Sequence, residues 1–150
     1  MGDNLGVRLR LVALIEILTL YTDECNLLTI DEIIDRLGEY GYDVTRRTVL
    51  SDLKELNRTS FKVICVNSPA KGYYLAKSYS QASLHLLLEA VYSSTVLTDD
   101  DVADLQSHLR STACIPTLEL LAETTENLNF RTSKVGVPVS YTHLRAHETV

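Results

Sequence analysis

The stretch Val44–Arg58, VTRRTVLSDLKELNR, carries the pattern that decides the fold. Apolar residues recur along it at helical spacing and predict one buried stripe, made by Val49, Leu53 and Leu56. The opposite face holds basic and hydroxyl residues at i, i+4, i+7 and i+11, namely Arg47, Ser51, Lys54 and Arg58. Such a helix suits a DNA major groove, because its apolar stripe is held down while polar side chains project outward. An ordinary amphipathic surface helix is the alternative.

The start of this helix is marked by Thr45, whose hydroxyl is a good N-cap. The residues from Arg46 to Thr48 then fill the first turn, the part that meets base edges in helix-turn-helix docking. The expected base contacts are Arg47, Thr48 and Ser51. The expected phosphate contacts from this helix are Arg46 and Lys54.

Two further helices are predicted upstream. The first covers Leu5–Leu20; its expected apolar face is Leu11, Leu14, Ile15 and Leu18, with Arg8, Arg10 and Glu16 off that face. The second opens at Thr29 with Glu32 three residues later, a capping box of the T-x-x-E type, and ends near Gly38–Gly41. Its N-terminus at Thr29 is a further expected phosphate contact. A short turn then leads to Thr45, which completes a helix-turn-helix.

A change of period after Arg58 predicts a β-hairpin. Phe61–Val66 is rich in β-branched residues, Asn67–Gly72 is a turn cluster, and Tyr73–Ala76 is the return strand. A hairpin directly after the third helix is a wing. Lys71 falls at its tip, where it is either a phosphate contact or a solvated turn lysine. Tyr73 and its neighbour alternate faces, so one of them should pack on the helices.

The net charge of −6 is unevenly distributed along the chain. Met1–Asp43 has three basic and nine acidic residues, and Ser80–Pro138 has three basic and eight acidic residues. Val44–Tyr79 has seven basic and two acidic residues, a local net charge of +5. Local charge governs phosphate contact more than the total does, so positive charge is concentrated where the helix and wing would meet DNA.

Several other classes of protein are disfavoured. No apolar run approaches the roughly 20 residues that span a bilayer, and Glu16 interrupts the N-terminal run that would resemble a signal peptide. The three cysteines match neither zinc spacing nor a disulfide framework, which predicts buried or half-buried free thiols in a reducing cytoplasm. No G-x-S-x-G and no phosphate-cradling glycine loop is present. We therefore expect no enzyme, no cofactor, no metal site and no membrane association.

Further helices are predicted after the wing. Ser80–Ser94 is amphipathic, with Leu84, Leu87, Leu88 and Val91 expected inward or holding two chains together as a homodimer. Thr98–Ser111 begins with an N-cap and three acids, which suit the positive end of a helix dipole better than a metal. Pro116–Leu128 is a further helix or an extended linker. The expected domains are a winged helix at 1–79, a helical linker or dimerisation region at 80–130, and a tail at 131–150.

Three motifs carry a resemblance to a known family. They are T-x-x-E-I-x-x-x-L from Thr29, G-Y-x-V-T-R-R-T-V-x-x-D-L-x-x-L from Gly41, and G-Y-Y-L-A from Gly72. Between Leu5 and about Arg110 the chain resembles the N-terminal part of bacterial WYL-type transcriptional regulators, which are related to DeoR-like winged helices. The resemblance implies a C-terminal effector domain that binds an unknown ligand. The chain has no Trp, so that domain is expected to be missing.

The sequence departs from the family at two positions and at its end. The family often has an aromatic residue and an arginine before the aspartate of the second motif, whereas Leu50 and Ser51 stand there. Val139–Thr149, VSYTHLRAHET, resembles one reading frame of a transposase adapter used in sequencing libraries. It predicts that the natural gene was cut near Pro138 and that the adapter was read through.

The sequence as a whole predicts a mainly α fold with a small β-hairpin, a winged helix-turn-helix followed by a helical linker region. The expected function is a sequence-specific transcriptional regulator that binds double-stranded DNA. A winged helix that serves only protein contacts, with Leu50 in a hydrophobic patch, is the alternative. The candidate DNA-binding residues are Thr29, Thr45, Arg46, Arg47, Thr48, Ser51, Lys54 and Lys71.

Overall fold

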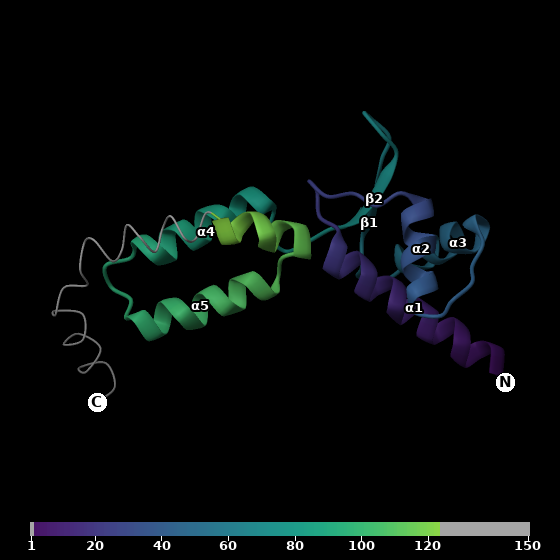
Figure 1. Ribbon diagram of the computed structural model, residues 1–150, viewed down its shortest axis with the longest axis horizontal. Coiled ribbons are helices and arrows are strands. Elements are labelled where there is room, and N and C mark those ends of the chain that lie inside the picture. Colours follow the sequence, from purple (N-terminus) through teal and green to yellow (C-terminus); the bar gives the residue numbers. More distant parts are fainter. Residues whose placement is uncertain (1, 124–150) are drawn as a thin grey trace. The chain divides into compact units, whose positions relative to one another are not determined.

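The computed structural model describes residues 2–123, which belong to two compact units (Figure 1). Among the described residues, the first unit comprises 2–78 with Cys114–Pro116, and the second comprises Tyr79–Ala113 and 117–123. The elements of the first unit are α1 (Gly2–Tyr21), α2 (Ile30–Glu39), α3 (Arg46–Leu56), β1 (Val63–Val66) and β2 (Gly72–Leu75). The second contains α4 (Gln81–Ser93) and α5 (Asp99–Ser111). This confirms the predicted mainly α fold with a small β-hairpin.

One hydrophobic core holds the first unit together. Helix α2 packs against both α1 and α3, and β2 contacts α1. The predicted stripe of α3 is confirmed, since Val49, Leu53 and Leu56 are all buried in this core. The other helices contribute Leu14, Ile17, Leu18, Ile33 and Leu37, none of which is exposed to solvent. The stripe therefore fixes which side of α3 faces outward.

The predicted apolar face of α1 was partly wrong. Ile17, which the prediction left out, is fully buried, whereas Leu11 and Ile15 are only half-buried. Arg10, which was expected off the face, turns toward α3. The reason is that α1 is apolar on nearly every side: Leu9 and Val12 are 50% and 60% exposed. A helix with apolar residues all round has no unique face that periodicity alone can identify.

The turns between the helices form as the sequence predicts. Thr29 and Glu32 make a reciprocal capping box at the start of α2, with N–H···O distances of 2.9 and 3.2 Å. Between α2 and α3, Gly41 has φ of 88°, a conformation that favours glycine. The next residue, Tyr42, donates its N–H to the carbonyl of Leu37 at 3.0 Å and packs on the core. This short turn completes the helix-turn-helix.

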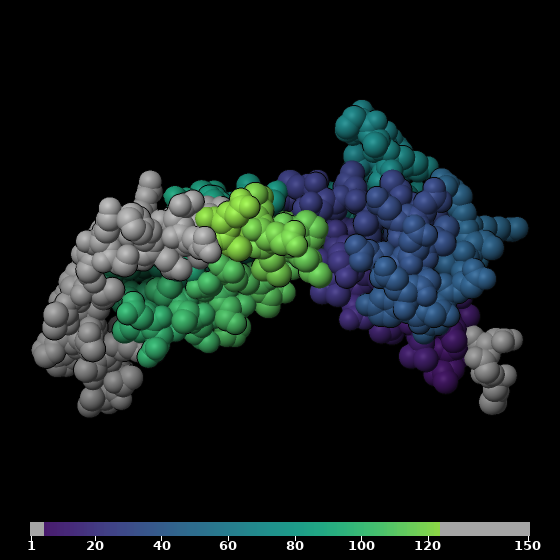
Figure 2. Space-filling view, in the orientation of Figure 1, coloured from purple at the N-terminus to yellow at the C-terminus, as the bar shows by residue number. Residues whose placement is uncertain are grey.

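The wing is an antiparallel hairpin that projects from the helices (Figure 1, Figure 2). Strand β1 is shorter than the predicted Phe61–Val66, whereas β2 has the predicted length and begins one residue earlier. Tyr73 is buried while Tyr74 is half-buried, as their alternation requires. Leu28 forms an isolated antiparallel bridge with Tyr73 of β2, through backbone hydrogen bonds of 3.0 and 2.8 Å. At Gly72 any Cβ would lie 2.7 Å from the Cβ of Leu27, so only glycine allows this approach.

Thr22 joins the end of α1 to the hairpin. Its fully buried hydroxyl donates to the carbonyl of Leu18 at 2.5 Å and accepts the N–H of Leu75 at 3.0 Å. Thr22→Val would leave that N–H unpaired in the core, so we expect the free energy of unfolding to fall by about 1–3 kcal/mol in urea denaturation. Thr19→Val is the control, because its exposed hydroxyl bonds only the Ile15 carbonyl. Equal losses of stability in the two variants would contradict the role of the Thr22 hydroxyl in joining α1 to the hairpin.

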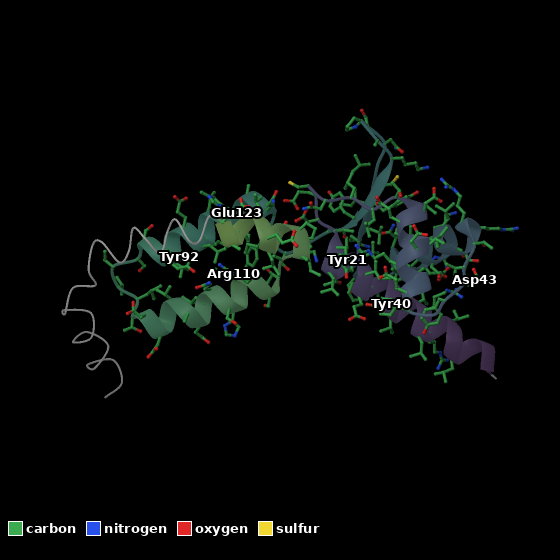
Figure 3. All side chains as sticks on the ribbon, viewed as in Figure 1. Tyr21, Tyr40, Asp43, Tyr92, Arg110 and Glu123 are labelled. Atoms are coloured by element: carbon green, nitrogen blue, oxygen red, sulfur yellow. The ribbon has the colours of Figure 1, made fainter. Side chains whose placement is uncertain are left out.

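The second unit is a helical hairpin of α4 and α5 that also contains a further helical stretch. Leu84 and Leu88 are buried as predicted, and they pack with Leu121, Leu109 and Ala113. Leu87 is 37% exposed, so its inward prediction was wrong, and the buried Tyr92 takes the inner position. The run of three leucines at 86–88 cannot all face inward, and periodicity alone does not decide among them. Tyr92 points toward Arg110 of α5 (Figure 3).

The remaining predictions for this region have mixed outcomes. Thr98 and Asp101 form a capping box, which confirms the cap interpretation of the acidic cluster. Residues 115–123 are helical, so the helix alternative for the Pro116 region is correct over that range. None of the helices in residues 2–123 is long and apolar enough to cross a membrane. The predicted tail, 131–150, lies outside the described residues.

The cysteines are free thiols, as predicted, but their burial differs from the prediction. Cys25 and Cys65 are exposed; Cys25 lies in the loop after α1, and Cys65 lies on β1 of the hairpin. Only Cys114 is buried, and its thiol donates to a carboxylate oxygen of Asp23 at 3.1 Å.

Candidate nucleic-acid interface

The outward face of α3 gathers three of the predicted residues. Arg47, Ser51 and Lys54 are all exposed, on the side of the helix opposite the buried stripe. Arg58, the fourth member of the predicted face, lies beyond the helix, and its guanidinium pairs with Glu55 at 3.2 Å. The face therefore presents two cationic groups and one hydroxyl from a single rigid element.

The cap of α3 uses two of the predicted site residues. The hydroxyl of Thr45 accepts the backbone N–H of Thr48 at 3.3 Å, which confirms the predicted N-cap. The two hydroxyls are also 3.0 Å apart, and Thr48 is half-buried. These threonines thus fix where the helix begins and hold its first turn in place.

Thr29 precedes the first residue of α2, and Arg46 is the first residue of α3. The Arg46 guanidinium is 3.4 Å from the carboxylate of Asp31, and the two side chains are 61% and 80% exposed. Such an exposed pair contributes little stability and opens readily to a competing phosphate. Thr29 is exposed, but its N–H already donates to Glu32. The acids in the first turn of α2 oppose an anion there, which makes Thr29 the weakest of the candidates.

Arg47 makes no ion pair with any residue in the described part of the chain. Asp43, a possible partner, lies in the turn ahead of α3 (Figure 3). The guanidinium is thus available to an external acceptor. Lys71 is exposed in the turn of the wing, directly before β2, and belongs to no ion pair among residues 2–123.

An ion pair that was not predicted sets the orientation of α3. The guanidinium of Arg10 donates two hydrogen bonds to the carboxylate of Asp52, at 2.7 and 2.9 Å. The side chains are only 18% and 8% exposed. The hydrogen bond with Asp52 is the main cause that raises the pKa of Arg10, although burial opposes it. This bidentate contact ties α1 to the inner side of α3 and resists rotation of the helix about its axis.

The sequence contained a signal for this pair. Asp52 is three residues after Val49 and four before Leu56, so it falls on the apolar stripe of its own helix. Arg10 is likewise four residues before the buried Leu14. A charged residue on each of two stripes that meet in one core indicates a buried ion pair, because a buried charge needs a partner.

A hollow of about 490 Å³ separates α3 from the hairpin. Its apolar lining comes from Leu50 and Leu53 of α3 and from Val63, Cys65 and Tyr73 of the hairpin. Ser51, Lys54 and Asn57 supply polar groups. The side chain of Asn57 exchanges hydrogen bonds of 3.0 and 2.8 Å with the backbone of Val63. This exchange fixes the hairpin to the end of α3, so the two walls of the hollow form one structure.

Comparison with known proteins finds a curated relative of part of the chain. The chain is 35% identical over 77 residues to a protein named arginine repressor from Caldicellulosiruptor saccharolyticus. The match covers 51% of this chain and 48% of the relative, so the chain spans about half of the relative's length. No family model matches the chain, and no solved structure matches it.

Proposed function

We propose that the first unit binds duplex DNA and reads its sequence, as the DNA-binding part of a transcriptional regulator. The observation that carries the proposal is the outward face of α3, where Arg47, Ser51 and Lys54 project from a helix whose other side is fixed in the core. A rigid helix with outward donors is what the major groove accommodates. The similarity to a protein named as a repressor supports the same class of function.

The roles of the individual residues follow from their positions. Arg47, Thr48 and Ser51 contact base edges, because they lie in the first turns of α3. Arg46, Lys54, Lys71 and the N-terminus of α2 at Thr29 contact phosphates. Thr45 contributes by holding the first turn through its cap. The local charge of +5 in Val44–Tyr79 favours this interface within an acidic protein.

The finer assignment is to the bacterial WYL-type regulators with a DeoR-like winged helix. The three motifs that begin at Thr29, Gly41 and Gly72 support it, and in this assignment the protein acts in the cytoplasm with a ligand-binding effector domain. Residues 139–149, which resemble an adapter, are then foreign to the regulator. They lie outside the described residues.

A homodimer is part of the proposal, because helix-turn-helix regulators usually read two half-sites about one helical turn apart. The apolar surface of α4 that could hold two chains together is smaller than predicted, since Leu84 and Leu88 are buried within their own unit. Leu86 and Leu87 remain, at 64% and 37% exposure. Light scattering at micromolar concentration is expected to give the mass of two chains, and a monomer in the presence of a two-half-site duplex would contradict this part.

The experiment that tests the function is selection from a random duplex pool with the full chain. Enrichment of one sequence pattern, followed by an electrophoretic shift with that duplex, is the expected result. The alternative function is a winged helix that serves only protein contacts. It is favoured if no pattern is enriched and no duplex shifts, while Leu50 and its neighbours still bind a protein partner.

Lys71 provides a separate prediction because it belongs to the wing. Lys71→Ala is expected to weaken the binding of all duplexes alike and to lower the slope of log K against log salt by about one unit, the effect of one lost phosphate contact. Fluorescence anisotropy over a salt series measures both quantities. Arg8→Ala is the matched control, since Arg8 is an exposed cation on α1. Loss of base preference in Lys71→Ala would contradict the phosphate role.

A further inference from the structure

Leu50 is the one large apolar residue exposed on α3. Its side chain is 41% exposed, whereas the other large apolar residues of the helix, Val49, Leu53 and Leu56, are nearly inaccessible. It lies three residues after Arg47 and four before Lys54, so these side chains are neighbours along the helix. An exposed leucine between two cations has no packing role in the core. A ligand that is both anionic and locally apolar would complement this position.

The hollow beside Leu50 has the same mixed character. Its inner surface comes from Leu53, Val63 and Tyr73, each less than a tenth exposed. Lys54 stands among the lining residues, and the polar group of Asn57 is already bonded to the backbone of Val63. The lining thus offers apolar surface, bordered by positive charge, on the side of α3 that faces the wing.

Duplex DNA offers an apolar group close to negative charge. In the major groove only thymine presents an apolar group, the methyl at C5, beside hydrogen-bonding atoms and close to phosphates. The basic residues around Leu50 complement the phosphates, and Leu50 complements the methyl. We propose, on the basis of the proposed DNA binding, that Leu50 reads the 5-methyl group of a thymine at the mouth of this hollow. Leu50 is thus a residue that determines specificity.

The test replaces each thymine of the selected duplex, one at a time, with deoxyuridine. This base keeps every hydrogen-bonding group of thymine and lacks only the methyl. At one or two positions the full chain is expected to bind about three- to fivefold more weakly, the effect of losing one buried methyl group. The unmodified duplex and anisotropy at fixed salt provide the reference.

Variants of the protein assign the effect to its residue. Leu50→Ala is expected to bind the thymine and deoxyuridine duplexes equally well at the sensitive position, as a double-mutant cycle requires of a direct contact. Leu9→Ala removes another exposed leucine, on α1, and should keep the full difference. Circular dichroism melting shows whether each variant is folded. The deoxyuridine series uses the unchanged chain, so it tests the methyl contact even if a variant fails to fold.

The outcomes separate this inference from the function on which it rests. Tight, sequence-dependent binding with no sensitivity to deoxyuridine at any position overturns the methyl contact and leaves the proposed function intact. The same holds if Leu50→Ala keeps the full difference. If the chain binds no duplex at all, the methyl contact and the proposed function are both overturned. This includes the case in which the hollow binds an acidic apolar peptide in place of DNA.

Discussion

Asp52→Ala is expected to lower the free energy of unfolding by about 3 kcal/mol, because breaking a buried ion pair leaves a charge without its partner. The substitution leaves the guanidinium of Arg10 without its bidentate partner at a site where it is only 18% exposed. The partial exposure of Arg10 places the loss at the lower end of the range for broken buried pairs. Urea denaturation followed by circular dichroism measures it.

Two comparisons make this result specific to the buried pair. Glu55→Ala removes the α3 partner of an exposed pair with Arg58, which lies just beyond the helix, and should leave stability nearly unchanged. The double variant Arg10→Met with Asp52→Leu replaces both charges by apolar side chains, and should recover most of the loss. A small effect of Asp52→Ala, similar to that of Glu55→Ala, would show that the pair does not fix α3.

Arg47→Ala is expected to weaken binding to the selected duplex about tenfold to a hundredfold and to relax preference at one base pair. The reason is that a bidentate arginine–guanine contact discriminates by roughly 1–3 kcal/mol. Arg47 lies in the first turn of α3, is exposed and makes no ion pair with the described residues. Anisotropy with single-base variants of the duplex measures the change at each position.

The competing explanation is that Arg47 only steadies the turn, for example through Asp43. In that case Arg47→Ala would lower the melting temperature and leave the affinity for DNA, measured well below that temperature, nearly unchanged. Arg8→Ala serves again as the control for the loss of one positive charge. An unchanged base preference in Arg47→Ala would falsify the base-reading role.

The local parts of the fold could be predicted from the sequence. The caps at Thr29, Thr45 and Thr98 depend on residues three positions apart, so neighbouring letters contain all the required information. The stripe of α3 was also predictable, because Val49, Leu53 and Leu56 recur at helical spacing. The hairpin followed from turn residues between two β-rich runs, although its first strand is shorter than expected.

The parts that could not be predicted depend on contacts between distant residues. The buried face of α1 is decided by its partners, because apolar residues surround this helix. The same is true of the leucine run in α4, where Leu87 faces solvent. The positions of Arg10 and Asp52 on apolar stripes indicated that each needs a partner, but they are 42 residues apart and only the fold shows that they meet. The hollow likewise needs the hairpin placed against α3. Each candidate residue on α3 could therefore be identified from the sequence, while the structure that orients them could not.

The most direct test of DNA binding through α3 is the affinity of the full chain for its selected duplex, measured over a series of salt concentrations and compared with a shuffled duplex. We expect the logarithm of the binding constant to fall linearly with the logarithm of the salt concentration, with a slope of several units. We also expect a clear preference for the selected duplex, which each mismatched base pair lowers by about 1–3 kcal/mol. Equal, salt-independent binding of both duplexes, or none at all, would contradict the proposed function.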